Sequence, residues 1–110
     1  MIKEIGLLKR KPGISPAEFS KAWRDFAPTV LSSYPGIRKY IQNVVVQLPG
    51  SEPSAYDGVA EAWWDDIESF LAAAARTQSE KGQGLISALD KFADLSQMLV
   101  ILAEERVMKK

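Results

Sequence analysis

The sequence predicts an α+β fold in which four antiparallel strands form one sheet and helices cover one of its faces. Two observations support this prediction. Segments typical of strands are interrupted by two segments whose apolar residues recur every three or four positions, the period of a helix. In chain order these segments read strand, helix, strand, strand, helix, strand. With 110 residues, 46% of them hydrophobic, we expect residues 1–110 to form a single domain.

The first strand and the start of the first helix are marked by clear local signals. Residues 1–11 are typical of a strand and end at the turn residues Pro12-Gly13. Ser15 suits the cap of a helix and Pro16 its first position, while Glu18 lies three residues after the cap and completes a capping box. The sequence therefore predicts that a helix begins at about Pro16.

The first helix has one apolar side, formed by Phe19, Trp23, Phe26 and Val30. Their spacing of three and four residues places them on the same side of a helix, which we expect to be buried. Pro28 lacks the N–H that would bond to the carbonyl of Arg24, so we expect the helix to bend or loosen near its last turns. Residues 33–36, Ser-Tyr-Pro-Gly, end the helix.

The middle of the chain predicts two neighbouring strands. Residues 37–48 read as a long strand with apolar residues on both faces, and residues 57–64 read as a third strand. The loop between them, residues 49–56, contains two prolines and lies where a hairpin would connect the strands.

The last third of the chain predicts a helix, a shorter helix and a final strand. Asp65 and Glu68 have the spacing of a second capping box. Residues 85–93 form the shorter helix, and residues 96–105 form the last strand. The buried stripe of the longer helix is expected to consist of Ile67, Phe70, Leu71 and Ala74.

The order β-α-β-β-α-β is that of the ferredoxin-like fold, with helices on one face of an antiparallel sheet. In the last strand Leu99 and Ile101 point one way, and Met98, Val100 and Leu102 point the other. A single copy would therefore expose an apolar sheet face to water. We expect a second copy to cover this open face, giving a two-fold homodimer.

Composition excludes several function classes. Fourteen basic and fourteen acidic residues give a formal net charge of zero, so nothing predicts binding to nucleic acid or to an anionic membrane. The chain has no cysteine and no histidine, which removes the thiolate nucleophile and the commonest general base and metal ligand. We expect no bound cofactor and no metal. With no apolar run long enough to cross a bilayer and no signal-peptide pattern at its start, the protein is predicted to be cytoplasmic.

Four segments resemble a known family over nearly the entire chain. The stretches "MIKEIGLLKRKPGISPAEF", "PGIRKYIQN", "YDGVAEAWWDD" and "FADLSQ" are similar to segments of the EthD family, in the same order and at fitting distances. That family consists of small dimeric α+β barrel proteins named after a component of bacterial ethyl tert-butyl ether degradation. The resemblance implies the same barrel, whose members act as monooxygenases, polyketide cyclases, isomerases or haem proteins. It also implies oxidative breakdown of ethers or related compounds.

The end of the first helix departs from that family. EthD proteins typically carry a His-Ala-Pro triplet there, whereas this chain has Phe26-Ala27-Pro28, with one residue fewer between Phe19 and the proline. Phenylalanine cannot transfer a proton. A one-residue deletion also turns the following residues by about 100° around a helix. Phe26 is either an ordinary core residue or an apolar wall of a ligand pocket.

Glu61 and Tyr40 are the candidate catalytic residues. Glu61 alternates with Val59 and Trp63, so apolar neighbours on its sheet face would raise the pKa of its carboxyl toward the range of a general base or acid. The alternative is a structural ion pair with Lys3, Lys39 or Arg38. Tyr40 can donate a hydrogen bond to a carbonyl or enolate oxygen of a substrate, or it can be a buried tyrosine bonded to the backbone.

Aromatic residues are the candidate substrate-binding groups. A cavity between the first helix and the sheet would be lined by Phe19, Trp23 and Phe26 and faced by Trp63 or Trp64, although the same helical stripe can also be ordinary core. Three functions remain open. The protein is a cofactor-independent enzyme acting on an aromatic or hydrophobic oxygenated small molecule, a non-catalytic binder of such a molecule, or a dimer that only binds a partner protein.

Overall fold

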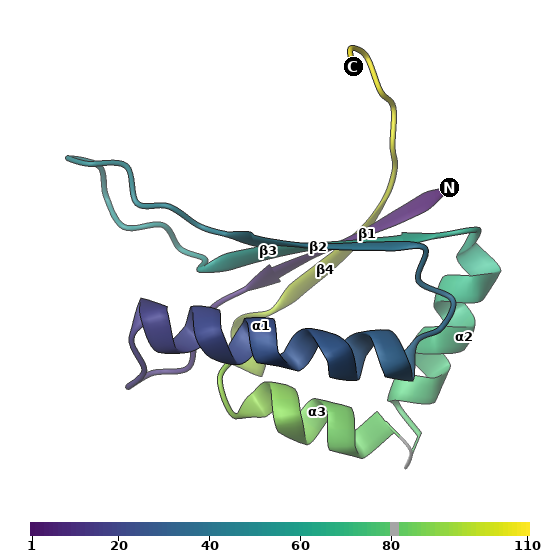
Figure 1. Ribbon diagram of the computed structural model, residues 1–110, viewed down its shortest axis with the longest axis horizontal. Helices are drawn as coiled ribbons and strands as arrows, with labels where there is room; N and C mark the ends of the chain where they lie inside the picture. Colours follow the sequence, from purple (N-terminus) through teal and green to yellow (C-terminus); the bar gives the residue numbers. More distant parts are fainter. Residues whose placement is uncertain (80–81) are drawn as a thin grey trace.

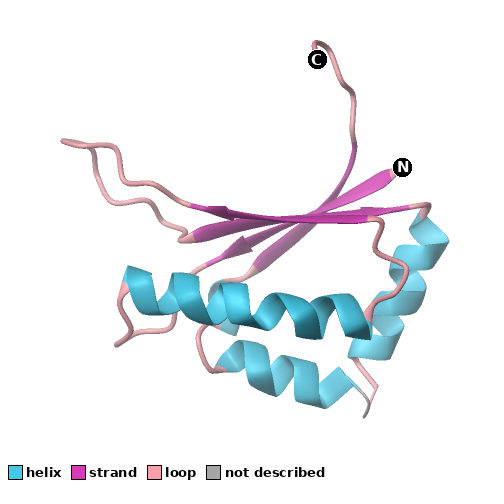
Figure 2. Ribbon diagram, in the orientation of Figure 1, coloured by secondary structure: helices cyan, strands magenta, loops and turns pink. Residues whose placement is uncertain are grey.

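The computed structural model describes residues 1–79 and 82–110, and it has the predicted ferredoxin-like α+β fold. The four strands form one sheet in the order β2-β3-β1-β4, and every neighbouring pair is antiparallel. All three helices lie on the same side of this sheet (Figures 1 and 2). The elements are β1 Ile2–Leu8, α1 Pro16–Ser33, β2 Lys39–Val44, β3 Gly58–Trp64, α2 Ile67–Thr77, α3 Gln83–Asp90 and β4 Leu99–Glu104.

Helix α1 begins as its sequence predicts. The Glu18 N–H donates to the Ser15 hydroxyl at 3.1 Å, and the Ser15 N–H donates to the Glu18 carboxylate at 2.9 Å, so both halves of the capping box are formed. The helix continues through Pro28 to Ser33, and the proline does not end it. Phe19 and Trp23 are each only 1% exposed, which confirms the buried side of the helix.

The core of the domain lies beneath α1 and around Phe92, which follows α3. The Phe92 ring packs edge-on against Phe26 at a centroid distance of 5.5 Å and against Phe19 at 5.8 Å. Leu8 from β1 and Ala93 complete this buried cluster. The contact joins the first helix to the segment before β4, so residues far apart in sequence hold the helical layer on the sheet.

The cap of helix α2 lies one residue later than predicted. Asp66, and not Asp65, is the cap: its carboxylate accepts hydrogen bonds from the N–H and the hydroxyl of Ser69 at 2.8 and 2.7 Å. Because the helix begins at Ile67, its third residue is Ser69 and not Glu68, and the predicted capping box does not form. Asp65 instead pairs with Arg38, accepting two hydrogen bonds at 3.0 and 2.6 Å.

The predicted buried stripe of α2 is half wrong. Ile67 and Leu71 are 47% and 56% exposed, while Phe70 and Ala74 face the interior. Figure 1 shows α2 across the end of the sheet, not flat upon it, so only a narrow side of this helix meets other elements. No described helix is long and apolar enough to cross a membrane.

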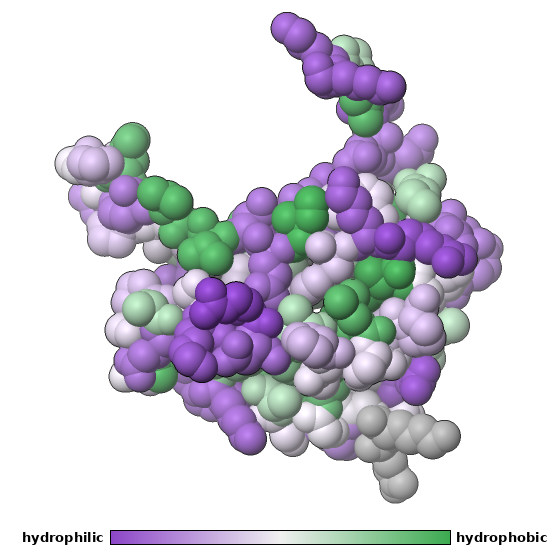
Figure 3. Space-filling model, in the orientation of Figure 1, coloured by the Kyte–Doolittle hydropathy of each residue, from purple (hydrophilic) through white to green (hydrophobic). Residues whose placement is uncertain are grey.

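All four strands are shorter than predicted, and β2 and β4 are so for physical reasons. Strand β2 ends at Val44, because it is an edge strand and its one neighbour, β3, begins at Gly58 opposite that residue. The chain beyond projects as a loop whose apolar atoms are visible in Figure 3, and Val46 is 87% exposed. Strand β4 begins only at Leu99, because a 3₁₀ turn, Leu95–Gln97, precedes it.

The sheet has one face without helices, which we call the open face. Strand register places Ile5 and Leu7 of β1 there, beside Ile101 and Leu99 of β4. Leu99 and Ile101 are 51% and 54% exposed, as the sequence predicts for a single copy. The helical side of β4 is also incompletely covered, because β4 is the other edge strand and its Val100 and Leu102 remain exposed.

Candidate functional site

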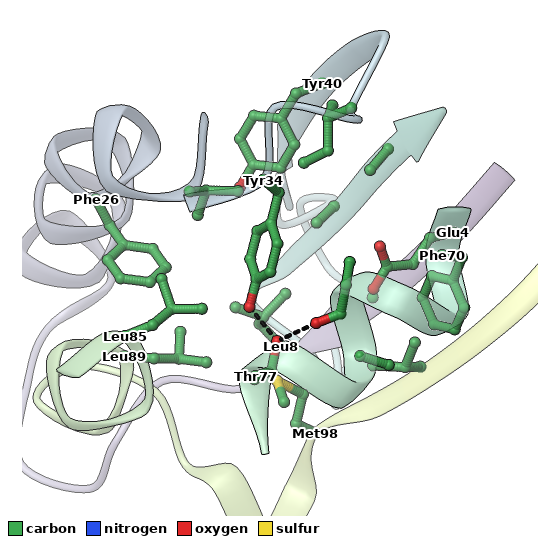
Figure 4. Close-up of a pocket in the computed structure, with 18 of the residues that line it drawn as sticks. Glu4, Leu8, Phe26, Tyr34, Tyr40, Phe70, Thr77, Leu85, Leu89 and Met98 are labelled. Carbon is green, nitrogen blue, oxygen red and sulfur yellow. Dashed lines mark hydrogen bonds between the residues drawn. The ribbon is translucent and has the colours of Figure 1, made fainter. Parts of the chain in front are cut away.

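A pocket of about 480 Å³ lies between the helical side of the sheet and the three helices. Figure 4 shows the side chains that converge on it from the sheet and from the helices. Its walls are mainly aromatic and aliphatic, and a few polar groups face into it. The wall residues include Trp23, Phe26, Val30, Tyr34, Ile37, Tyr40, Trp64, Phe70, Leu85, Leu89 and Met98.

The floor of the pocket consists of small residues on the two central strands. Gly6 of β1 lies opposite Ala60 of β3, and Ala62 is the next residue on the same face. A Cβ added to Gly6 would lie 3.7 Å from the Cβ of Ala60, which is ordinary van der Waals contact. The two strands therefore leave no gap between them at this point of the floor. Because these side chains are so short, the helices above cannot fill the space over the middle of the sheet.

Two polar side chains stand on either side of this floor. Ala62 pairs with Tyr40 of β2 on one side and with Glu4 of β1 on the other, so all three lie in one row on the helical face. Since neighbouring strands are 4.7–4.9 Å apart, the backbones of Tyr40 and Glu4 are roughly 10 Å from each other. The pocket thus has a polar group at each side of an apolar floor.

Tyr40 lies at the pocket as the sequence analysis anticipates. The amide of Gln42 donates to its hydroxyl at 3.3 Å and to the carbonyl of Trp23 at 2.9 Å. Burial raises the pKa of the Tyr40 phenol, and the negative charge of Glu4 raises it further. The phenol therefore stays protonated near neutral pH and is available as a hydrogen-bond donor.

Glu4 is the acidic residue that the sequence analysis missed. The indole N–H of Trp64 donates to its Oε1 at 3.1 Å. Burial raises the pKa of the Glu4 carboxyl, and the bond from Trp64 opposes this shift without cancelling it. The pattern that indicated Glu61 also applies to Glu4. Every second residue of a strand points to the same face, so Glu4 shares a face with Ile2, Gly6 and Leu8.

The far wall of the pocket is closed by a pair of hydroxyl groups. The hydroxyls of Tyr34, just after α1, and Thr77, at the end of α2, share a hydrogen bond (Figure 4). The Thr77 hydroxyl donates to the Ala73 carbonyl at 3.0 Å, so Tyr34 is the donor to Thr77. The Tyr34 ring also packs edge-on against Trp64 at 6.3 Å. This link holds the ends of two helices together beside the pocket.

Glu61 lies on the open face, with the sheet between it and the pocket. It pairs with Ile5 and Ile41. It lies between Ala60 and Ala62 on β3, whose side chains point to the opposite face and form the pocket floor. Its carboxylate forms an ion pair with Lys3 and accepts a hydrogen bond from Asn43 at 2.9 Å. The bond from Lys3 lowers the pKa of Glu61, so the expected rise is wrong, and the structure contains the alternative ion pair.

Of the predicted aromatic pocket residues, Trp23 and Phe26 line the pocket, and of the two alternatives on β3 it is Trp64 that does so. Phe19 and Trp63 do not line it. Phe19 packs within the core cluster. Trp63 faces the open side, where the ammonium groups of Lys3 and Lys39 each lie 4.8 Å from its ring centroid. The strand period explains both Trp63 and Glu61, because each lies one residue away from a pocket residue of β3.

Metal ligands do not gather anywhere in residues 1–79 and 82–110: no three acidic side chains lie close enough together to hold an ion. The polar residues that line the pocket carry two phenols, a carboxyl, a hydroxyl and an amide, and they are Tyr34, Tyr40, Glu4, Thr77 and Gln78. Such a set can orient a small molecule by hydrogen bonds and can exchange a proton with it at the Glu4 carboxyl.

Three solved structures with the same fold are similar to this chain. An EthD family protein from Bacillus halodurans has 24% sequence identity and a TM-score of 0.68, covering 96% of this chain and 100% of that chain. A dimeric ferredoxin-like protein of unknown function from Bacteroides fragilis has 11% identity and a TM-score of 0.65, covering 94% and 95%. SnoaB, a cofactor-independent oxygenase from Streptomyces nogalater, has 17% identity and a TM-score of 0.62, covering 98% and 97%.

Sequence comparison gives the family. No curated protein sequence matches the chain at a significant level. The model of the EthD domain matches residues 11–96, which include α1, β2, β3, α2 and α3. The matched region contains most of the residues that line the pocket. The chain therefore belongs to the EthD family.

Proposed function

We propose that this protein binds a largely apolar, ring-containing small molecule in the pocket and acts on it without a bound cofactor. The observation that supports this most directly is the pocket itself, whose volume of about 480 Å³ is in the range of small-molecule sites. Six aromatic side chains contribute to its walls, namely Trp23, Phe26, Tyr34, Tyr40, Trp64 and Phe70. Flat, apolar walls favour a flat, apolar ligand.

Tyr40 is the proposed hydrogen-bond donor to the ligand. Its raised pKa keeps the phenol protonated, so it can stabilise negative charge that develops on a carbonyl or enolate oxygen. The likeness in fold to SnoaB, a cofactor-independent oxygenase, supports an oxidative reaction in which dioxygen is the oxidant. The absence of histidine and cysteine from the chain leaves carboxyl and phenol groups for proton transfer.

We further propose that two copies associate through the open face. Leu99 and Ile101 expose about half of their surface there, and Ile5 and Leu7 extend the apolar area across β1. The likeness to a dimeric ferredoxin-like protein supports this arrangement. Equilibrium sedimentation should give twice the mass of one chain, and Ile101→Lys should lower that mass. A single-chain mass at micromolar concentration would reject the dimer.

Non-catalytic binding is the second candidate, and Phe26 favours it. The ring of Phe26 lines the pocket, at the helix position where the family typically carries a histidine that could transfer a proton. In this version the ligand is held by the same walls and is released unchanged.

One experiment tests binding and separates it from catalysis. Thermal unfolding is followed with a panel of naphthalene and anthracene derivatives, and each mixture is then analysed for new products by mass spectrometry. Ala60→Leu places a larger side chain on the pocket floor and should abolish the thermal shift. Ala75→Leu, on the exposed side of α2, is the matched control and should keep it. A shift with product supports an enzyme, a shift without product supports a binder, and no shift with any compound rejects both.

A further inference from the structure

Glu4 is the only acidic side chain of the described residues that lines the pocket. It lies near the middle of β1, and Figure 4 shows it reaching into the pocket beside Phe70. Its carboxyl has one protein partner among the described residues, the indole N–H of Trp64, which bonds to Oε1. No buried side-chain oxygen of the described residues lacks a partner, so the second oxygen, Oε2, is not sealed in protein. Because Glu4 lines the pocket, we infer that Oε2 faces it.

We propose that Oε2 of Glu4 accepts a hydrogen bond from an acidic hydroxyl group, phenolic or enolic, on the bound ring compound. This inference rests on the proposed function, because it names the contact that selects the ligand in the same pocket. An unpaired carboxyl in an apolar site is costly unless a donor meets it. A ligand hydroxyl supplies one donor on a body that fits the aromatic walls.

The geometry of the row favours a ligand that spans the floor. Glu4 and Tyr40 stand on opposite sides of Ala62, and their backbones are roughly 10 Å apart. That separation suits a fused two-ring or three-ring compound lying over the small residues of the floor. Glu4 then accepts from a hydroxyl at one end, while Tyr40 donates to an oxygen at the other.

A cationic ligand fits this pocket less well than a hydroxyl compound. An ammonium group has three donors, and Glu4 offers one free acceptor oxygen among apolar walls. The other two donors would find apolar walls next to Glu4 and would have to reach more distant polar groups of the pocket, which is unfavourable in an apolar site. A hydroxyl has a single donor and leaves nothing unpaired on its hydrogen.

Replacing Glu4 by glutamine should invert the polarity of the contact. The indole N–H of Trp64 needs an acceptor, so the amide oxygen of Gln would take the place of Oε1. The amide NH₂ would then occupy the place of Oε2 and present a donor to the pocket. Glu4→Gln has nearly the same shape, so the pocket volume is retained and only the hydrogen-bond direction changes.

The test compares 2-naphthol with 2-methoxynaphthalene by isothermal titration calorimetry. The two share a ring system, but only 2-naphthol has a hydroxyl donor. The wild-type protein should prefer 2-naphthol by on the order of tenfold or more, as for a hydrogen bond to a charged group. Glu4→Gln should reduce that preference to about one, because its NH₂ donates to the methoxy oxygen. Glu61→Gln is the matched control, an acid on the neighbouring strand but on the open face, and should keep the wild-type preference.

The outcomes distinguish this inference from the proposed function. If the wild-type protein and Glu4→Gln bind both compounds with the same preference, the role of Glu4 is rejected while the pocket remains a ligand site. Tighter binding of 2-(aminomethyl)naphthalene than of 2-naphthol also rejects it. If the wild-type protein binds none of the three compounds, 2-naphthol, 2-methoxynaphthalene and 2-(aminomethyl)naphthalene, both proposals fail. Should the variant not fold, the carboxyl ¹³C resonance of Glu4 in the wild-type protein must move with 2-naphthol and not with 2-methoxynaphthalene.

Discussion

Gly58 offers a direct test of how tightly the pocket wall is packed. It is the first residue of β3, and it is buried against the ring of Trp23. A Cβ added at this position would lie 2.6 Å from Cζ3 and 2.8 Å from Cη2 of that ring, which is closer than carbon atoms approach in proteins. Trp23 is 1% exposed, so the side chains and backbone that bury its ring must shift if the ring turns. Alanine at position 58 therefore forces either the strand or the helix to move.

The expected cost of Gly58→Ala is at the upper end of the usual range for overpacking, about 2–3 kcal/mol. Backbone conformation adds nothing, because the glycines with positive φ in the described residues are Gly13 and Gly50. Urea unfolding followed by tryptophan fluorescence measures the loss, with all samples at one protein concentration. Gly84→Ala is the control, since no atom lies within 4 Å of its added Cβ, and it should be neutral or stabilising by up to about 1 kcal/mol. A Gly58→Ala variant within about 0.5 kcal/mol of wild type would refute this account of the wall.

Four further predictions concern the helix caps and the two acids of the sheet. Ser15→Ala should cost about 1 kcal/mol in urea unfolding because it removes the hydroxyl that accepts from the Glu18 N–H, and an unchanged midpoint would contradict that role. Asp66→Ala should lower the midpoint more than Asp65→Ala because Asp66 is the cap of α2, and the reverse order would restore the cap predicted from sequence. Glu61 has a lowered pKa in the folded protein, so the stability it contributes is present at neutral pH and is lost as the pH falls through and below 4.5. Glu4 has a raised pKa, so the wild-type protein should lose stability relative to Glu4→Gln as the pH rises above 4.5. Parallel pH profiles of the unfolding free energy for the wild-type protein and Glu4→Gln would refute the Glu4 shift, and parallel profiles for the wild-type protein and Glu61→Gln would refute the Glu61 shift.

The order of elements could be predicted because local signals and tertiary structure agree over most of the chain. The capping box at Ser15 and the stripe of Phe19, Trp23 and Phe26 depend only on residues within one helix, and both are confirmed. The cap of α2 could not be fixed in the same way. Asp65 and Asp66 are both good caps, and choosing between them requires knowing that Arg38, from a distant part of the chain, pairs with Asp65.

The limits of β2 depend on its neighbours more than on its own sequence. Residues 45–48 continue an apolar, β-branched pattern, yet the strand ends at Val44 where β3 supplies no further partner. Propensity alone therefore overestimates the length of an edge strand.

The site was predictable only in part, because alternation along a strand does not say which face the helices cover. Glu4 and Glu61 each alternate with apolar residues, and both faces of the central strands carry apolar side chains. The alternation along each strand shows that an acidic residue has apolar neighbours. It does not show whether that residue lies in the pocket or on the open face. The orientation of Phe26 was easier to predict, since helix periodicity places it on the buried side of α1. It has a place in both of the environments that were expected, because it contacts Phe92 in the core and also lines the pocket.

The small residues of the central strands explain why the pocket exists at all. Protein interiors normally pack to the density of organic crystals, so larger side chains at Gly6, Ala60 and Ala62 would fill the space beneath the helices. Leaving apolar walls in contact with water forgoes burial that would stabilise the fold at about 25 cal/mol per Å². A ligand that covers these walls recovers that free energy and binds only the folded chain, so occupancy must raise the unfolding temperature with ligand concentration. The thermal shift therefore measures the apolar surface that the small side chains at Gly6, Ala60 and Ala62 leave unburied in the free protein.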